Sequence, residues 1–269
     1  MPKAKVSEIN IYYEVHGQGE PLVLIQGLSG SHSAWVFQAR AFKKHYQVIT
    51  FDNRGAGKTG KSSGPYTIRT MAEDTIGLLD YLGVDKAHVL GISLGGMIAQ
   101  EIAINHPEKV RKLVLACTSA GGERRTDIHP EMLVAIGVKE GTAAVDFSSV
   151  DPVESMSAII SLAFNRRLYR MVLLPLSRIS MKLGGGAGHL EQMEAVVGYS
   201  TIDRLHLITA RTLVITGTDD RIVPPHYSEV LASQIPNARL VKVEGGSHSF
   251  FVEMRGRFNR EVLDFLSGS

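Results

Sequence analysis

The stretch VLGISLGGMIAQ, residues 89–100, decides the fold because a single serine joins two kinds of secondary structure there. The apolar run over 88–92 predicts a buried strand, and the pattern from Leu94 to His106 predicts a helix. Residues 91–95, GISLG, fit G-x-S-x-G, a sharp turn that pushes the hydroxyl of Ser93 out over the carboxyl end of a sheet. Such a turn strains the backbone and leaves no room for flanking side chains, so it requires a glycine on each side.

Short apolar runs and helical patterns alternate before and after this turn. Val6 to Val15 predicts a strand or hairpin, and helical spacing follows over 67–83, from Pro225 onward and at the C-terminal end. Because strands that alternate with helices form βαβ crossovers, we expect a mostly parallel sheet with helices on both faces. The runs that predict its buried strands are 21–27, 47–52, 88–92, 111–116, 211–217 and 238–245.

The alternation stops between about residues 122 and 204. Asp151 is placed as the N-cap of a helix, with Pro152 at its first position. A second helical pattern over 168–183 is expected to kink or break at Pro175, and a third covers 190–199, after the flexible GGGAG of 184–188. The prediction is an α/β core, 1–121 and 205–269, with a helical cap, 122–204, inserted into it.

A histidine and two aspartates follow later strands of the predicted sheet. His248 lies in GGSHSFF after the last strand, and Asp219 and Asp220 lie in GTDDRIVPP after the preceding one. A serine hydroxyl is a weak nucleophile that needs a base in contact with it and a third group that orients the base. The chain order Ser, Asp, His is the order expected for a nucleophile on a strand-to-helix turn.

With these residues the chain resembles the α/β-hydrolase superfamily over nearly its whole length. DNRGAGKTG, 52–60, looks like the D-x-R-G-x-G loop of that superfamily, and LIQGLSGSHSAW, 24–35, looks like its HG oxyanion loop. The family pattern G-x-x-D-x-x-x-P places the acid at Asp220, with Asp219 as the alternative, because adjacent residues in an extended turn point opposite ways. The sequence departs from the family at Gln26, where a histidine is common.

The resemblance implies acyl transfer by Ser93, His248 and Asp220 through an acyl-enzyme, with the backbone N–H groups of Leu28 and Leu94 as the oxyanion hole. It is nearest to enol-lactonase and small carboxylesterase members, which implies a small-molecule ester or lactone substrate. Carbon–carbon bond hydrolases and cofactor-free haloperoxidases or perhydrolases also keep the serine and stay as alternatives. A non-catalytic receptor for a small ligand on the same scaffold is an alternative of another class.

Candidate pocket residues come from the cap and from the aromatic residues near the motifs. Methionines suit varied apolar ligands but also pack helices together, and five of the nine lie in the cap: Met132, Met156, Met171, Met181 and Met193. The arginines at 166, 167 and 170 fit a solvated helix face. The predicted substrate contacts are Trp35, Phe250, Met132 and Met171.

Composition excludes several other classes of function. A net charge of +2 over 269 residues, with no dense basic block, does not predict a nucleic-acid partner. Cys117 is the single cysteine and is expected to pack as a core hydrophobe in a reducing compartment. No apolar run approaches a membrane span, so a cytoplasmic location is expected. No metal-ligand motif and no GxGxxG fingerprint is present, so no metal and no cofactor is predicted, and the oligomeric state stays open.

Overall fold

The central element is an eight-stranded sheet with the order β1-β2-β4-β3-β5-β6-β7-β8. A computed structural model describes residues 2–60, 64–122, 129–138, 145–181 and 188–268. β2 pairs antiparallel with β1 and with β4, and every other neighbouring pair in the sheet is parallel. The strands are β1 (Lys3–Val6), β2 (Ile9–His16), β3 (Glu20–Ile25), β4 (Tyr46–Phe51), β5 (Ala87–Ile92), β6 (Val110–Ala116), β7 (Arg211–Gly217) and β8 (Ala238–Val243).

Helices cover both faces of this sheet, as predicted. Successive strand residues point to opposite faces, so Val23 joins the core beneath α2 (Ile68–Tyr81), α3 (Leu94–Asn105) and α8 (Pro225–Gln234). Leu24 joins the second core, beneath α1 (Val36–Phe42) and α10 (Arg255–Ser267). Burial on both faces explains why these strands are continuous apolar runs in the sequence.

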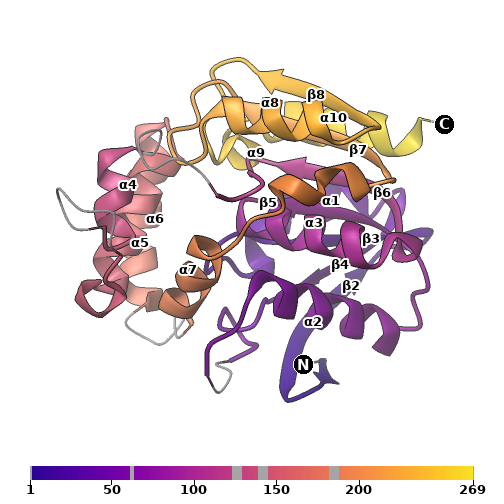
Figure 1. The fold of residues 1–269 in the computed structure, drawn as a ribbon, viewed down its shortest axis with the longest axis horizontal. Helices are drawn as coiled ribbons and strands as arrows, with labels where there is room; N and C mark the ends of the chain where they lie inside the picture. The colour runs from indigo at the N-terminus through magenta and orange to yellow at the C-terminus, as the bar shows by residue number, and fades with distance from the viewer. Residues whose placement is uncertain (1, 61–63, 123–128, 139–144, 182–187, 269) are drawn as a thin grey trace.

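Among the described residues, four α-helices lie between β6 and β7 in the chain and gather at one end of the sheet, left in Figure 1. They are α4 (Pro130–Ala135), α5 (Pro152–Ala163), α6 (Arg167–Ser180) and α7 (His189–Val197). Asp151 caps α5, because its carboxylate accepts from the backbone N–H groups of Val153 and Glu154. Of the predicted GGGAG linker, residues 184–187 lie outside the described part of the chain.

The structure differs from the sequence prediction in several helices. α6 runs without a break through Pro175, so the helix does not break there. The single C-terminal helix is divided into α9 (Phe250–Glu253) and α10, with Met254 between them. The short helices α1 and α4, of seven and six residues, were not predicted, because helices this short depend on tertiary packing. None of the described helices has the length and apolarity needed to cross a membrane.

Candidate active site

Ser93 occupies a strained turn between β5 and α3. Its backbone has φ +54° and ψ −124°, a region that residues with a side chain rarely adopt. A Cβ atom on Gly91 would lie 2.1 Å from the carbonyl oxygen of Gly95, and one on Gly95 would lie 2.2 Å from that of Ile25. Both glycines of the G-x-S-x-G motif are therefore required by the close approach of neighbouring backbone.

Hydrogen bonds from β6 and the segment after it hold this turn. The Ser93 N–H donates to the carbonyl oxygen of Ala116 at 2.9 Å, and the Thr118 hydroxyl donates to the carbonyl oxygen of Ser93 at 2.7 Å. Strain of this kind costs on the order of 1–3 kcal/mol and persists only where surrounding contacts fix it.

His248 and Asp220 form a buried pair beside this turn. Nδ1 of His248 lies 2.8 Å from Oδ2 of Asp220, and Oδ1 of Asp220 accepts from the backbone N–H groups of Ile222 and Val223, both at 2.9 Å. The carboxylate of the neighbouring Asp219 is on an exposed residue and accepts from the Thr218 hydroxyl at 3.1 Å. The structure thus places Asp220, and not Asp219, against the imidazole.

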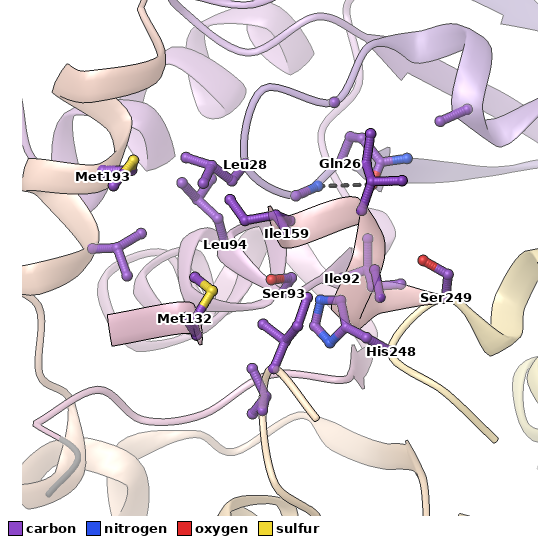
Figure 2. Close-up of a pocket in the computed structure, with 18 of the residues that line it drawn as sticks. Gln26, Leu28, Ile92, Ser93, Leu94, Met132, Ile159, Met193, His248 and Ser249 are labelled. Carbon is purple, nitrogen blue, oxygen red and sulfur yellow. Dashed lines mark hydrogen bonds between the residues drawn. The ribbon is translucent and has the colours of Figure 1, made fainter. Parts of the chain in front are cut away.

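Figure 2 shows the imidazole of His248 beside Ser93, and both residues line the same cavity. Because Nδ1 faces a carboxylate, the network assigns the proton to Nδ1 and leaves Nε2 free to accept another. Ser93, His248 and Asp220, chosen from the sequence, are therefore brought together by the ends of β5, β7 and β8.

Cys117 lies close to the His–Asp pair. Its Sγ and one ligand atom each of Asp220 and His248 lie within 4.8 Å of one another, the one such group of possible metal ligands in the described chain. Burial, with a smaller effect from the charge of Asp220, raises the pKa of the Cys117 thiol well above its ordinary value. A protonated, fully buried thiol fits the predicted role of a core residue.

The loop after β3 lies opposite His248 and is fixed by side-chain hydrogen bonds. Oε1 of Gln26 accepts from the N–H of Gly27 at 2.8 Å, dashed in Figure 2, and Nδ2 of Asn53 donates to the carbonyl oxygen of Gln26 at 2.9 Å. Gln26 in place of the common histidine therefore still braces the loop. Leu28 from this loop and Leu94 from the first turn of α3 both line the cavity next to Ser93.

The cavity has a volume of about 500 Å³ and lies between the sheet edge and the cap. Among the described residues that line it, none is Asp, Glu, Lys or Arg. The cap contributes apolar side chains from four helices: Met132, Ile159, Ile160, Leu173, Leu176, Met193 and Val196.

Three of the four predicted substrate contacts need correction. Trp35 is fully buried and packs against Phe251, with ring centroids 5.4 Å apart, so it supports the cavity wall from behind. Phe250 is also fully buried, against Phe258, and its neighbour Phe251 lines the cavity instead. Met171 is 62% exposed on the outer side of α6. Met132 alone of the four lines the cavity.

The sequence prediction missed most of the cavity wall. The cap residues Ile159, Leu173 and Val196, and Ile222 after β7, carry no motif. Helical periodicity could identify an apolar side on each cap helix, but which side faces Ser93 depends on how the helices pack. The arginines at 166, 167 and 170 do not line the cavity; Arg166 and Arg167 are exposed, in agreement with the predicted solvated face, and Arg170 is partly buried.

A serine on a strand-to-helix turn, with a His–Asp pair from two later strand ends, defines a hydrolase of the α/β type. Comparison with known proteins identifies the family: the chain matches the alpha/beta hydrolase fold over residues 20–150 and 175–254, and it belongs to that family.

Three similar proteins are informative. "Putative carbamate hydrolase RutD" of Azorhizobium caulinodans is 31% identical over 269 residues, which cover 98% of each chain. A hydrolase from Pseudomonas aeruginosa PA01 superposes with a TM-score of 0.84 at 28% identity, over 99% of this chain and 98% of that one. The enol-lactonase from Burkholderia xenovorans LB400 also gives 0.84, at 26% identity, over 99% and 100%. The protein is a hydrolase.

Proposed function

We propose that the protein is a serine hydrolase that cleaves carboxylic esters or lactones of small, partly apolar substrates. In this proposal Ser93 is the nucleophile, His248 the base and Asp220 the group that orients the base. The observation that carries it is the meeting of three strand ends at one cavity, where Ser93 and His248 both line the wall and Asp220 holds Nδ1 of His248.

The reaction follows from the proton positions. Nε2 of His248 takes the Ser93 proton as Oγ bonds to the substrate carbonyl carbon, which gives a tetrahedral oxyanion. When this intermediate collapses, the carbon–oxygen bond to the alcohol breaks and Nε2 returns the proton to the leaving oxygen. In a lactone that oxygen stays attached to the acyl group. Water then repeats the addition with His248 as base, which releases the acid and restores Ser93.

The backbone N–H groups of Leu28 and Leu94 are the proposed oxyanion donors. The N–H of Leu94 belongs to the first turn of α3, where backbone donors have no partner within the helix and the helix dipole favours negative charge. Loss of one donor of this kind costs about 10²–10³ in kcat.

The cavity wall supports an uncharged, partly apolar substrate. A charged group placed in it would lose hydration without meeting an opposite charge on any described lining residue, and that loss is costly. A volume of about 500 Å³ also exceeds what a substrate of a few atoms requires. Each CH₂ group buried on an acyl chain is worth about 0.8 kcal/mol, or about fourfold in kcat/KM.

Hydrolysis of a carbamate is the second candidate, because the relative named as a carbamate hydrolase matches nearly the whole chain. The uncharged wall favours a neutral carbamate ester over the small carbamate anion. A carbon–carbon substrate requires the same serine and base, so only substrate comparison separates these reactions.

The test is a panel of p-nitrophenyl esters with acyl chains of two to eight carbons, together with lactones, an aryl carbamate ester and a ring-cleavage diketone. The expected result is a pre-steady-state burst of p-nitrophenol, with kcat/KM that rises with chain length until the cavity is full. Ser93→Ala should be inert. Equal turnover by wild type and Ser93→Ala would overturn the proposal, and binding without turnover would instead indicate a receptor.

A further inference from the structure

Ser29, the residue after Leu28, has an unusual backbone conformation. Its φ is +54°, in the left-handed region that glycine adopts readily and serine rarely does. The φ angle of Ser29 orients the peptide unit between Leu28 and Ser29, which adjoins the unit that carries the N–H of Leu28, so its conformation helps to fix where that N–H points. Contacts that hold Ser29 in this state therefore act on the proposed oxyanion hole.

Two side chains of cap helix α7 make these contacts. Oε1 of Gln192 accepts from the N–H of Ser29 at 2.7 Å, and Nδ1 of His189 lies 2.8 Å from the Ser29 hydroxyl. Both side chains are fully buried. Hydrogen bonds shielded from water in this way are costly to break on one side only, because the other partner stays buried.

The network around His189 assigns a single direction to its hydrogen bonds. The Ser155 hydroxyl, on α5, donates to Sδ of Met193 at 3.6 Å and lies 3.0 Å from Nε2 of His189. Nε2 therefore carries the ring proton, and Nδ1 accepts from the Ser29 hydroxyl. Burial lowers the pKa of His189 to about 4, so the ring is neutral near pH 7.

We call the hydrogen bonds from Gln192 and His189 to Ser29 the clamp. Gln192 also bonds to the core. Nε2 of Gln192 donates to the carbonyl oxygen of Arg54 at 2.7 Å. The Arg54 guanidinium is buried and binds the Asp74 carboxylate through two hydrogen bonds, 2.5 Å from Nε and 2.6 Å from Nη2. Gln192 thus ties Ser29 to a loop that is itself fixed against α2.

We propose that Gln192 and His189 are positioning residues of the oxyanion hole, which they act on by holding Ser29 in its left-handed conformation. Helix α7 of the cap then completes a site whose reacting groups all belong to the core. This inference rests on the proposed serine-hydrolase function. Because a displacement of about 1 Å can cost about 10²-fold in rate, release of Ser29 should affect the transition state more than substrate binding.

The first test replaces Gln192 by Leu, which keeps the volume and removes both hydrogen bonds. We expect kcat to fall about 10–100-fold, with KM within about twofold of wild type. A trifluoromethyl ketone, which forms a tetrahedral adduct with Ser93, should lose affinity by the same factor. The matching methyl ketone, which binds as a ground-state ligand, should not.

Gln38→Leu is the matched control. Gln38 is also a fully buried glutamine that makes two hydrogen bonds, to the carbonyl oxygen of Phe251 and to Asn259, but it does not contact Ser29. Its loss should lower the melting temperature and leave the preference for the trifluoromethyl ketone over the methyl ketone unchanged. The single tryptophan, Trp35, is buried, so its emission reports a folded core in each variant.

A second pair of variants tests the clamp if Gln192→Leu does not fold. Ser29→Ala and His189→Leu remove the same hydrogen bond from its two sides, so the double variant should lose no more kcat than the worse single variant. Additive losses, or a Gln192→Leu enzyme that keeps its ketone preference within about twofold, would overturn the inference. A wild type without Ser93-dependent turnover would instead overturn the proposed function.

Discussion

The core and the cap build this site in different ways. At the turn between β5 and α3, every residue that flanks Ser93 is buried, and backbone atoms leave no space for a side chain on Gly91 or Gly95. Helix α6 of the cap has no fully buried residue, although two of its leucines line the cavity. The core fixes the reacting atoms by close backbone contact. Most of the cap instead covers the cavity with apolar side chains, and substitutions among such side chains should be tolerated more easily.

The cap also makes polar contacts with the core. On one side His189 and Gln192 hold the loop after β3, and on the other the buried carboxylate of Glu253 accepts from the N–H groups of Asn165 and Arg166 at 3.2 and 2.7 Å. The first contact reaches the loop after β3, next to Ser93, and the second reaches helix α9, which begins two residues after His248. Most of the cap therefore only covers the cavity, but the cap residues that meet the core also hold core segments next to the site in position.

Ser93→Ala tests the core with the largest expected effect. Without the nucleophile, kcat should fall by about 10⁴–10⁶, because only binding and oxyanion stabilisation remain. The measurement is p-nitrophenol release by equal amounts of the two proteins, with mass spectrometry to show that the variant contains no wild-type protein. Residual turnover above one part in about 10³ would mean that another group carries the reaction.

Asp220→Asn should be the next largest change. An amide cannot hold the proton on Nδ1 of His248 or stabilise the imidazolium, so kcat should fall by about 10³–10⁴ with little change in KM. Asp219→Asn is the matched control and should retain wild-type kcat, since Asp219 is exposed. If the two variants exchange these outcomes, the acid has been misassigned.

His189→Gln tests the polar contact between cap and core through its effect on the free energy of unfolding. The pKa of His189 is lowered from 6.5 to about 4 in the folded protein, mainly by burial, with a small opposing effect of Glu191. Below pH 6.5 the unfolded chain binds a proton that the folded chain does not accept until about pH 4. His189 should therefore destabilise the fold progressively between pH 6.5 and 4, by about 3 kcal/mol in total.

The measurement is urea unfolding of both proteins at pH 7.5 and pH 4.5. Wild type should lose more free energy of unfolding between these pH values than His189→Gln. Equal losses would show that His189 is not buried in its neutral form.

Met171→Ser should have the smallest effect and tests the tolerance of the outer cap. Because Met171 is 62% exposed and does not line the cavity, the change should alter the free energy of unfolding by less than about 0.5 kcal/mol and kcat/KM by less than about twofold. Met132→Ser, in the cavity wall, should instead raise KM for medium-chain esters. A large loss from Met171→Ser would mean that this surface takes part in substrate binding.

The fold and the positions of Ser93 and His248 could be predicted because each depends on local sequence, whereas the sequence left Asp219 as an alternative to Asp220. The strand-to-helix turn needs Gly91 and Gly95 whatever lies above it, and a strand buried on both faces must be a short apolar run. Trp35, Phe250 and Met171 were wrongly assigned to the pocket for the opposite reason. Their sequence neighbours lie near the site, but each side chain points into the core or to solvent.

The sequence by itself determined the α/β core, the turn that carries Ser93 and the order of its partners, because backbone sterics and strand burial act over a few residues. Only the tertiary structure decided which of Asp219 and Asp220 meets His248, which cap side chains line the cavity and that Gln192 reaches Ser29 across 163 positions of the chain. These contacts depend on how separate elements pack. No local pattern encodes the relative orientation of two helices, so it emerges only when the whole core is buried together.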